Sequence, residues 1–207
     1  MFYLKNVKYK DILDIKEAKI KQNQLTVVVG ESGSGKTTFL NLLNKMISAD
    51  SGDVYYKDQN IKEIDSVDLR REVMMMHQKT VIYPKTIKDN LKIASQFSNK
   101  EETSDNQLKE ILNDFNLNKS LNDNAYDLSE GEKQRLALAR IIVAKSQVLL
   151  LDEPTAALDK SNEKIIVDYL KSLIENEGKT IIMVSHSEQV LKDDNIDIIE
   201  IKDKGVF

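Results

Sequence analysis

Short, continuous apolar runs recur along the chain in a pattern that is typical of buried β-strands. The runs at 25–29, 148–151 and 180–185 consist largely of β-branched and leucine side chains, as in strands that are covered on both faces. Weaker strand patterns occupy 2–9, 12–20, 54–56, 73–76 and 196–201. Because helix patterns separate several of these runs, the alternation predicts an α/β fold with a mainly parallel sheet.

Amphipathic helix patterns fill much of the remaining chain. After the first buried run, one predicted helix face carries Phe39, Leu42, Leu43, Met46 and Ile47. Helical spacing also dominates residues 86–145, interrupted by a polar stretch at 116–127, and it returns at 165–174. We therefore expect one domain over 1–207, in which a helical lobe at about 86–145 is inserted into an α/β core formed by 1–85 and 146–207.

Composition narrows the class of protein. The chain is 41% apolar with a formal net charge of −4, which indicates a globular protein and argues against nucleic acid as a partner. It has no cysteine and only two histidines, which excludes disulfides, zinc–thiolate sites and multi-histidine metal sites. No apolar run approaches the ~20 residues of a membrane span, and the N-terminus does not resemble a signal peptide. We therefore expect a cytoplasmic protein whose membrane role, if it has one, requires a separate chain.

A glycine-rich segment follows the first buried strand and precedes a helix. It matches the phosphate-loop pattern G-x-x-x-x-G-K-[ST] and consists of Gly30, Glu31, Ser32, Gly33, Ser34, Gly35, Lys36 and Thr37, with Thr38 next. Such glycines let successive N–H groups point into one concavity, where they and the helix N-terminus bind phosphate oxygens. The pattern predicts that Lys36 contacts the β- and γ-phosphates of a nucleotide and that Thr37 places its hydroxyl on Mg²⁺.

Two carboxylates follow the apolar run at 148–151. Strands of this kind deliver their C-terminal residues to the sheet edge where ligands bind. Because successive strand residues point to opposite sides, Asp152 and Glu153 are expected to have different roles. We predict that Asp152 holds Mg²⁺ and that Glu153 is the general base that activates the attacking water.

A third motif, Leu128-Ser129-Glu130-Gly131-Glu132, precedes a long helix pattern. Ser129 and Glu132 have the S-x-x-E spacing of a capping box, which starts a helix. A capped helix start with a nearby glycine is also suited to an anion. The segment is therefore compatible with a structural role and with phosphate binding.

Together these motifs, with Leu-Asp-Glu-Pro-Thr-Ala-Ala-Leu-Asp at 151–159, resemble the ATP-binding subunits of ABC (ATP-binding cassette) transporters. The resemblance covers essentially the whole chain and follows the family's motif order. It implies a P-loop NTPase fold of the ABC ATPase type, with a parallel core, an N-terminal antiparallel β region and a helical lobe. It also implies ATP hydrolysis with Mg²⁺.

The resemblance assigns further site residues. Gln78 matches the glutamine loop, which contacts Mg²⁺ and the catalytic water, and His186 matches the switch histidine at the γ-phosphate. Asp159 matches the D-loop aspartate, and Tyr9 is the best match for the aromatic residue that stacks on adenine. The signature departs from the usual L-S-G-G-Q, because Glu130 replaces a glycine and Glu132 replaces the glutamine.

In the family, two such subunits pair head to tail, so that Ser129 and Gly131 of one would close over the ATP held by Lys36 of the other. The resemblance therefore implies an ATP-bound homodimer that drives a membrane permease on a separate chain, from the inner face of the membrane. The segment 84–91 resembles the exporter-like form, so we expect export, with import as the alternative direction.

Two other classes of protein are alternatives to a transporter subunit. A soluble, non-transport ABC ATPase would share every motif, although the chain has no coiled-coil insertion, second cassette or net basic charge. A small P-loop kinase would not need the signature or the Asp152–Glu153 pair. Co-purification with a membrane protein separates the first alternative, and phosphate release without an acceptor separates the second.

Overall fold

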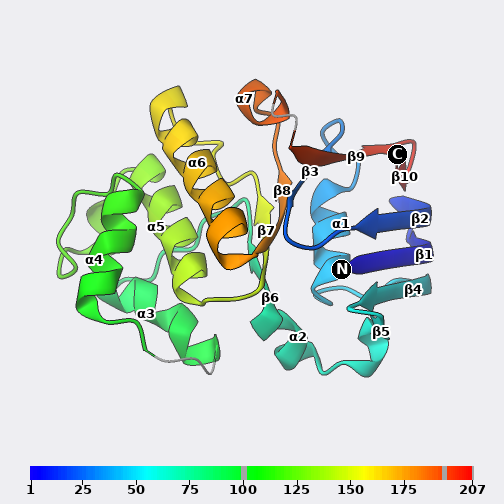
Figure 1. The fold of residues 1–207 in the computed structure, drawn as a ribbon, viewed down its shortest axis with the longest axis horizontal. Helices are drawn as coiled ribbons and strands as arrows, with labels where there is room; N and C mark the ends of the chain where they lie inside the picture. Colours follow the sequence, from blue (N-terminus) through cyan, green and yellow to red (C-terminus); the bar gives the residue numbers. More distant parts are fainter. Residues whose placement is uncertain (99–101, 193–194, 207) are drawn as a thin grey trace.

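The computed structural model of the chain describes residues 1–98, 102–192 and 195–206 (Figure 1). Its first sheet is antiparallel, with the strand order β2-β1-β4-β5. The strands are β1 (Phe2–Tyr9), β2 (Leu13–Ile20), β4 (Ser51–Tyr56) and β5 (Gln59–Asn60). The N-terminal antiparallel region that the family resemblance implies is therefore confirmed.

The second sheet has the order β10-β9-β3-β8-β7-β6, and all of its neighbouring strands run parallel except β10. Its strands are β3 (Leu25–Val29), β6 (Val73–Met76), β7 (Val148–Asp152), β8 (Thr180–Val184), β9 (Ile196–Lys202) and β10 (Gly205–Val206). This is the mainly parallel sheet that the buried apolar runs predict. Its topology brings the carboxyl ends of β3, β6, β7 and β8 to one edge.

Side chains of the parallel sheet alternate between two hydrophobic cores. Val27 and Leu149 pack against the helices on one face, whereas Val28 and Leu150 pack on the other face against α1 (Lys36–Leu43) and the antiparallel sheet. In Figure 1, α1 accordingly lies between the antiparallel strands and the central strands. The continuous apolar runs thus reflect strands buried on both faces.

The helix α1 is shorter than its apolar pattern predicts. It ends at Leu43, and Lys45 has a φ of 57°, a left-handed conformation that stops the helix. The predicted helix face therefore does not extend to Met46, which is 50% exposed, or to Ile47, which packs against the core from beyond the helix. The expectation for these two residues was wrong because their apolar spacing continues past the break.

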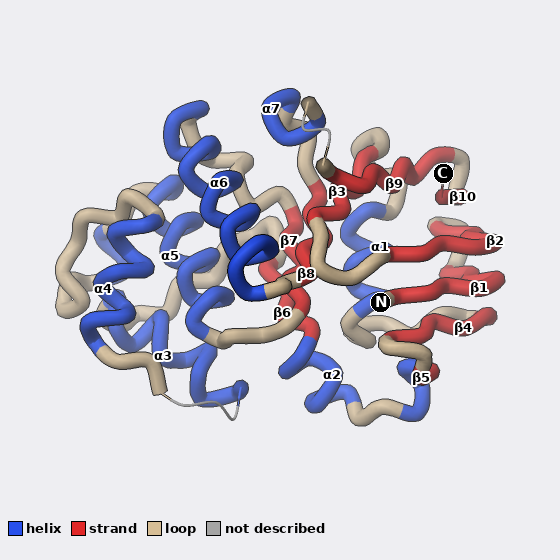
Figure 2. Tube along the Cα trace, viewed as in Figure 1, coloured by secondary structure: helices blue, strands red, loops and turns tan. Residues whose placement is uncertain are grey.

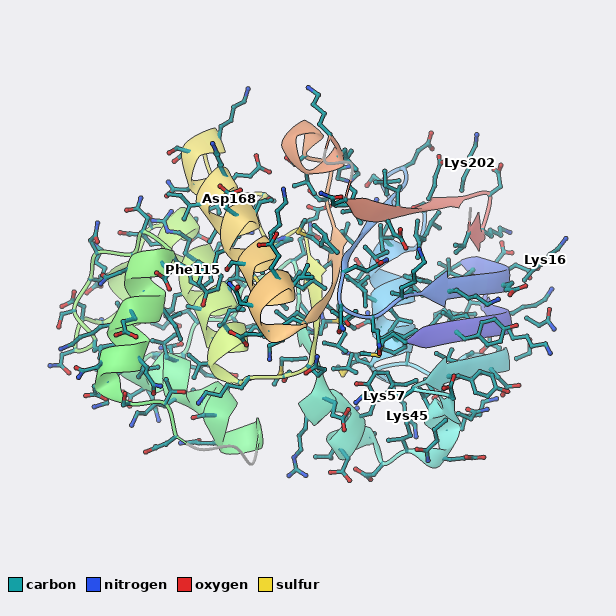
Figure 3. The ribbon with its side chains drawn as sticks, viewed as in Figure 1. Lys16, Lys45, Lys57, Phe115, Asp168 and Lys202 are labelled. Atoms are coloured by element: carbon teal, nitrogen blue, oxygen red, sulfur yellow. The ribbon has the colours of Figure 1, made fainter. Side chains whose placement is uncertain are left out.

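Helices cover the other face of the parallel sheet, and Figure 2 shows them together on one side of the strands. They are α3 (Ile87–Ser98), α4 (Asp105–Asp114), α5 (Glu130–Val143) and α6 (Lys160–Glu177). Phe115, labelled in Figure 3, is fully buried among them, with its ring 4.7 Å from that of Tyr169. The smaller helices are α2 (Ser66–Glu72), α7 (Glu188–Leu191) and the 3₁₀ turns Ile61–Glu63 and Ala125–Asp127.

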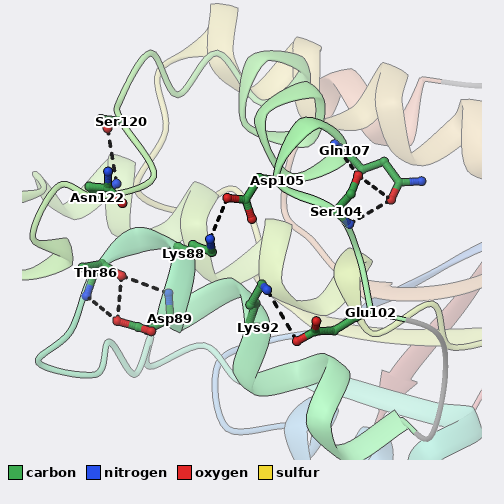
Figure 4. A network of polar contacts seen from close by, with 10 residues as sticks. All are labelled: Thr86, Lys88, Asp89, Lys92, Glu102, Ser104, Asp105, Gln107, Ser120 and Asn122. Atoms are coloured by element: carbon green, nitrogen blue, oxygen red, sulfur yellow. Dashed lines mark hydrogen bonds and ion pairs between the residues drawn. The ribbon is translucent and has the colours of Figure 1, made fainter.

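Polar contacts join the starts of α3 and α4 (Figure 4). Ser104 and Gln107 form a capping box at the start of α4, which satisfies backbone N–H groups there. The Lys88 ammonium of α3 lies 2.6 Å from the Asp105 carboxylate of α4. The ion pair therefore joins the first turns of the two helices at the surface. No helix within the described part of the chain is long and apolar enough to cross a membrane.

Candidate nucleotide site

The loop between β3 and α1 has a backbone that only glycine adopts readily. Gly30 and Gly35 have φ values of 148° and 105°. A Cβ at Gly30 would lie 2.4 Å from the Ile201 carbonyl oxygen, and a Cβ at Gly35 would lie 3.0 Å from the Ile12 and Leu13 side chains. The glycine spacing is therefore required by both conformation and space.

The start of α1 is open to an anion. Its N-cap, Gly35, provides no side-chain hydrogen bond, and no acidic residue lies in the first turn. The first N–H groups of a helix lack partners within the helix and carry a partial positive charge. Lys36 is 8% exposed, and its ammonium donates to the carbonyls of Gly30 and Glu31, each at 2.8 Å. This loop therefore concentrates hydrogen-bond donors and positive charge.

Asp152 ends β7 directly beside this loop. The residue is 2% exposed, and its carboxylate accepts a hydrogen bond from the Thr37 hydroxyl at 2.7 Å. Burial raises the pKa of Asp152, and the nearby Glu153 carboxylate raises it further. Such a carboxylate gains stability from a bound cation, which compensates its buried charge.

Glu153 lies just beyond the strand and not within it. Its φ of 50° is left-handed, and its N–H donates to the Val184 carbonyl at 3.1 Å. The reason predicted for its different role, strand alternation, was therefore wrong: this turn in the chain, and not alternation, separates Glu153 from Asp152.

Two more side chains meet the Glu153 carboxylate. Gln78, which follows β6, donates its amide N–H to Oε2 of Glu153 at 2.8 Å. His186, which follows β8, has its Nε2 3.8 Å from Oε1 of Glu153. Side chains that follow β6 and β8 therefore converge on the carboxylate that follows β7.

These groups surround a cavity of about 290 Å³. Its lining consists of Ile12, Ser32, Gly33, Gly35, Lys36, Thr37, Thr38, Gln78, Asp152, Glu153 and His186. All of these except Ile12 are sequence-predicted site residues. Of the other phosphate-loop residues, Gly30 and Glu31 face the Lys36 ammonium through their carbonyls, and the Ser34 hydroxyl is buried without a hydrogen-bond partner.

Ile12 was missed, and Tyr9 lies elsewhere. Tyr9 is not part of the cavity lining; it packs against the core under the antiparallel sheet, and the Lys10 ammonium lies 5.2 Å from its ring centroid. The hairpin from β1 to β2 is tight, with the Ile12 N–H donating to the Tyr9 carbonyl at 3.1 Å. The sequence signal that could have identified Ile12 is its position in the short turn between the first two strand patterns. The structure places this turn next to the phosphate loop.

The signature residues lie outside this cavity. Ser129 is the N-cap of α5, and Glu132 completes the predicted capping box by accepting from the Ser129 N–H at 2.8 Å. A Cβ at Gly131 would lie 3.2 Å from the Ala157 carbonyl oxygen. Asp159 is the N-cap of α6. A single chain therefore does not bring these residues to the phosphate loop.

The donors at the cavity fit Mg²⁺ in the manner of nucleotide sites. Mg²⁺ prefers oxygen ligands and is usually held by one or two carboxylates together with substrate phosphates. Asp152, Thr37 and Gln78 supply a carboxylate, a hydroxyl and an amide to this cavity. Within 1–98, 102–192 and 195–206, no cluster of three His, Cys, Asp or Glu residues could hold a metal ion alone. The set is thus suited to a metal that arrives with phosphate.

Comparisons with known proteins agree with this geometry. The ABC transporter family matches residues 13–156. The phosphate import ATP-binding protein PstB of Malacoplasma penetrans (strain HF-2) is 40% identical over 199 residues, which are 90% of this chain and 68% of that protein.

Solved structures give the same answer. The dimeric structure of a bacterial ABC transporter cassette has a TM-score of 0.88 and 28% identity, covering 100% of this chain and 96% of that one. Its post-hydrolysis state bound to ADP and Pi has a TM-score of 0.86 and 29% identity, with the same coverage. The chain therefore belongs to the ATP-binding proteins of the ABC transporter family, and it is an ATPase that binds ATP with Mg²⁺.

Proposed function

We propose that the chain is the ATP-hydrolysing subunit of a membrane transporter and acts on a permease carried by a separate chain. The observation that carries the proposal is the cavity in which the phosphate loop meets Asp152, Glu153, Gln78 and His186. We also propose that 1–207 acts as one ATPase domain, with the helical lobe at 86–145 inserted into the core.

The phosphate loop and the start of α1 bind the phosphates of ATP. Backbone N–H groups of the loop and the Lys36 ammonium bind the β- and γ-phosphates, because both supply positive charge in one concavity. Thr37, Asp152 and Gln78 hold Mg²⁺, which supplies positive charge to the phosphate oxygens when bound. No aromatic residue is among those that line the described cavity, and Ile12 is its apolar lining residue.

Hydrolysis falls to Glu153. Its side chain is 25% exposed, so water reaches it, while Gln78 donates a hydrogen bond to its carboxylate and the His186 Nε2 lies 3.8 Å from it. It takes a proton from the water that attacks the γ-phosphate, and the His186 side chain, which is 57% exposed, contacts that phosphate. Gln78 orients the same water through its hydrogen bond to Glu153.

A homodimer completes the site. Ser129 and Asp159 are exposed, and with Gly131 they lie outside the chain's own cavity. The bacterial cassette that this chain resembles is dimeric. In the proposed head-to-tail pair, these residues contact the ATP held by the partner's phosphate loop.

A groove beside β6 suits the permease. It has a volume of about 450 Å³ and lies between α2, β6, α3 and α5. Its apolar lining includes Val67, which is 50% exposed, and Tyr83, which is 39% exposed. Arg70, Arg71 and Arg140 also line it. An apolar permease segment flanked by acidic residues complements this surface, and its docking places the chain on the cytoplasmic face of the membrane.

The proposed direction of transport is export, because the segment 84–91 resembles the exporter-like form. The PstB relative is named as an importer, so import is the alternative. Inside-out vesicles that contain the chain and its permease separate the two. Added ATP should make them accumulate substrate if the chain powers export and lose it if the chain powers import.

The catalytic assignment is tested by Glu153→Gln. The amide cannot take a proton, so the variant should bind ATP while hydrolysing it about 10²–10⁴-fold more slowly, the usual contribution of a general base. It should also accumulate as an ATP-bound dimer in size-exclusion chromatography. Glu177→Gln is the control, because Glu177 is the last residue of α6, and this variant should hydrolyse ATP at the wild-type rate.

The transporter assignment needs its own measurement. An affinity-tagged chain purified from detergent-solubilised membranes should retain a membrane protein, and Val67→Glu in the groove should release it without changing the ATPase rate. ATP hydrolysis by Glu153→Gln at the wild-type rate would show that Glu153 is not the general base. An active ATPase that retains no membrane protein would favour the soluble, non-transport ATPase.

A further inference from the structure

A buried glutamine connects α5 to the turn that carries the proposed general base. Gln134 lies in the second turn of α5 and is 4% exposed. Its amide N–H donates to the Glu153 carbonyl at 2.9 Å, and its amide oxygen accepts from the Ala157 N–H at 2.9 Å. One side chain therefore bridges both ends of the turn that follows β7.

The turn has a conformation that needs such support. Glu153 has a φ of 50°, in the left-handed region that non-glycine residues adopt only when their surroundings hold them there. Its carbonyl accepts from Gln134 and also from the Ala156 N–H at 3.3 Å. These bonds fix the main chain at Glu153 and so direct its carboxylate toward Gln78 and His186.

The start of α5 packs against the same turn. A Cβ at Gly131 would lie 3.2 Å from the Ala157 carbonyl oxygen and 3.5 Å from the Leu158 side chain. The helix therefore packs closely on the turn, and a side chain at 131 would require the Ala157 carbonyl to shift by a few tenths of an ångström. Gln134, one turn further along α5, adds the two hydrogen bonds that fix this contact.

We propose that Gln134 is a positioning residue for ATP hydrolysis, which holds the 153–157 turn so that the Glu153 carboxylate faces the attacking water. It lies outside the nucleotide cavity and acts through Glu153. The inference rests on the proposed function, which makes Glu153 the base and presents the start of α5 to the partner's ATP. The contact between α5 and the 153–157 turn then sets the position of Glu153 in the same subunit.

The test compares two glutamines that hold backbone carbonyls at opposite ends of β7. Gln134→Met keeps the side-chain length and removes both hydrogen bonds. Gln147→Met is the matched control, because Gln147 donates to the Gly178 carbonyl at 2.7 Å, far from the cavity. Steady-state ATP hydrolysis gives kcat and KM, and calorimetric titration gives the Kd for Mg-ATP.

Gln134→Met should lower kcat about 10–100-fold, because small displacements of a catalytic group have effects of this size, while Kd stays within about threefold. Gln147→Met should leave both unchanged. Equal kcat in the two variants would overturn the proposal. If Gln134→Met does not fold, Gln134→Asn replaces it, because its amide is one methylene shorter and cannot span both the Glu153 carbonyl and the Ala157 N–H.

Wild-type kcat in Gln134→Asn would likewise overturn the positioning role. The outcomes also separate this inference from the proposed function. If Glu153→Gln hydrolyses ATP at the wild-type rate, the assignment of the base fails. If Glu153→Gln is inactive and Gln134→Met is fully active, only the role of Gln134 fails.

Discussion

Two helix starts in this chain carry motifs that we propose bind phosphate, and they are built in opposite ways. At α1 the N-cap is Gly35, which offers no side chain to the helix, and the first turn holds no acidic residue. At α5 the N-cap is Ser129, which forms a capping box with Glu132, and both Glu130 and Glu132 lie in the first turn. One helix start is left open, and the other is closed by its own side chains.

The difference separates two uses of the same backbone chemistry. The unpaired N–H groups of α1 are available to phosphate, and Lys36 adds a charge beside them. At α5 the Glu132 N–H already bonds the Ser129 hydroxyl and the Ser129 N–H bonds the Glu132 carboxylate. The carboxylates in the first turn of α5 stabilise the helix while opposing an anion. We therefore expect the two halves of the proposed dimer site to contribute unequally, with α1 supplying most of the ATP affinity.

The largest expected effect is on ATP affinity, and it comes from the open start of α1. Lys36→Ala removes the only lysine or arginine among the described residues that line the cavity. Charge-assisted hydrogen bonds are worth about 1.5–3 kcal/mol each, so ATP affinity should fall by roughly 100-fold or more. Calorimetric titration with Mg-ATP measures it. Lys133→Ala, in the first turns of α5, is the control and should bind ATP as the wild type does. Unchanged affinity in Lys36→Ala would exclude α1 as the principal phosphate site.

Much of the fold was predictable because its signals are local. Continuous apolar runs predict the strands of the parallel sheet, and parallel topology then brings their carboxyl ends to one edge. That is why the structure gathers Lys36, Asp152 and Glu153 around one cavity. The left-handed residue that ends α1 early has no such signal, since Lys45 is not a typical residue at that conformation.

The parts of the site that sequence reasoning missed depend on distant backbone atoms. Gln134 bonds a carbonyl 19 residues away, and the pattern around it shows only a helix. Ile12 reaches the cavity because the β1–β2 hairpin is tight, whereas Tyr9 at its other end turns into the core. Spacing along the chain does not report these contacts, because they are set by how separate elements pack.

A smaller effect is expected at the closed end, from Glu132→Gln. The Ser129 N–H and the Lys119 ammonium hold the pKa of Glu132 below its usual value. A lowered pKa adds stability above the unfolded value of 4.5, and this stability is lost as the pH falls through the folded value. Glutamine keeps an acceptor for Ser129 but loses the charge.

The free energy of unfolding of Glu132→Gln should therefore be lower by about 0.3–1 kcal/mol at pH 7, the usual worth of a charge at a helix start. Urea titrations of both proteins without nucleotide measure the difference, which should shrink as the pH is lowered below 4.5. A difference that persists or grows in acid would show that the charge of Glu132 does not stabilise the closed end.

The smallest effect is expected on the association of the dimer, from Glu130→Gly, which restores the usual glycine of the signature. The Glu130 side chain is 82% exposed and lies 3.0 Å from the Lys133 ammonium, so water and a partner both weaken its field. At ~8 Å from one excess phosphate charge, repulsion is about 2 kcal/mol at an effective dielectric of 20 and about 0.5 kcal/mol at 80. The high exposure favours the lower figure.

The two consequences of Glu130→Gly arise in different states of the protein. In the monomer, loss of a first-turn carboxylate and its ion pair should reduce stability by about 0.5–1 kcal/mol. In the ATP-bound dimer, made in the Glu153→Gln background, loss of the repulsion should tighten association about twofold, since 0.5 kcal/mol is a factor of about two. The gain should vanish near 1 M salt, where the Debye length is about 3 Å.

Analytical ultracentrifugation with ATP at two ionic strengths measures the association of the dimer. Equal or weaker association at low salt would mean that Glu130 faces away from the nucleotide, and the two helix starts would then differ in their capping alone.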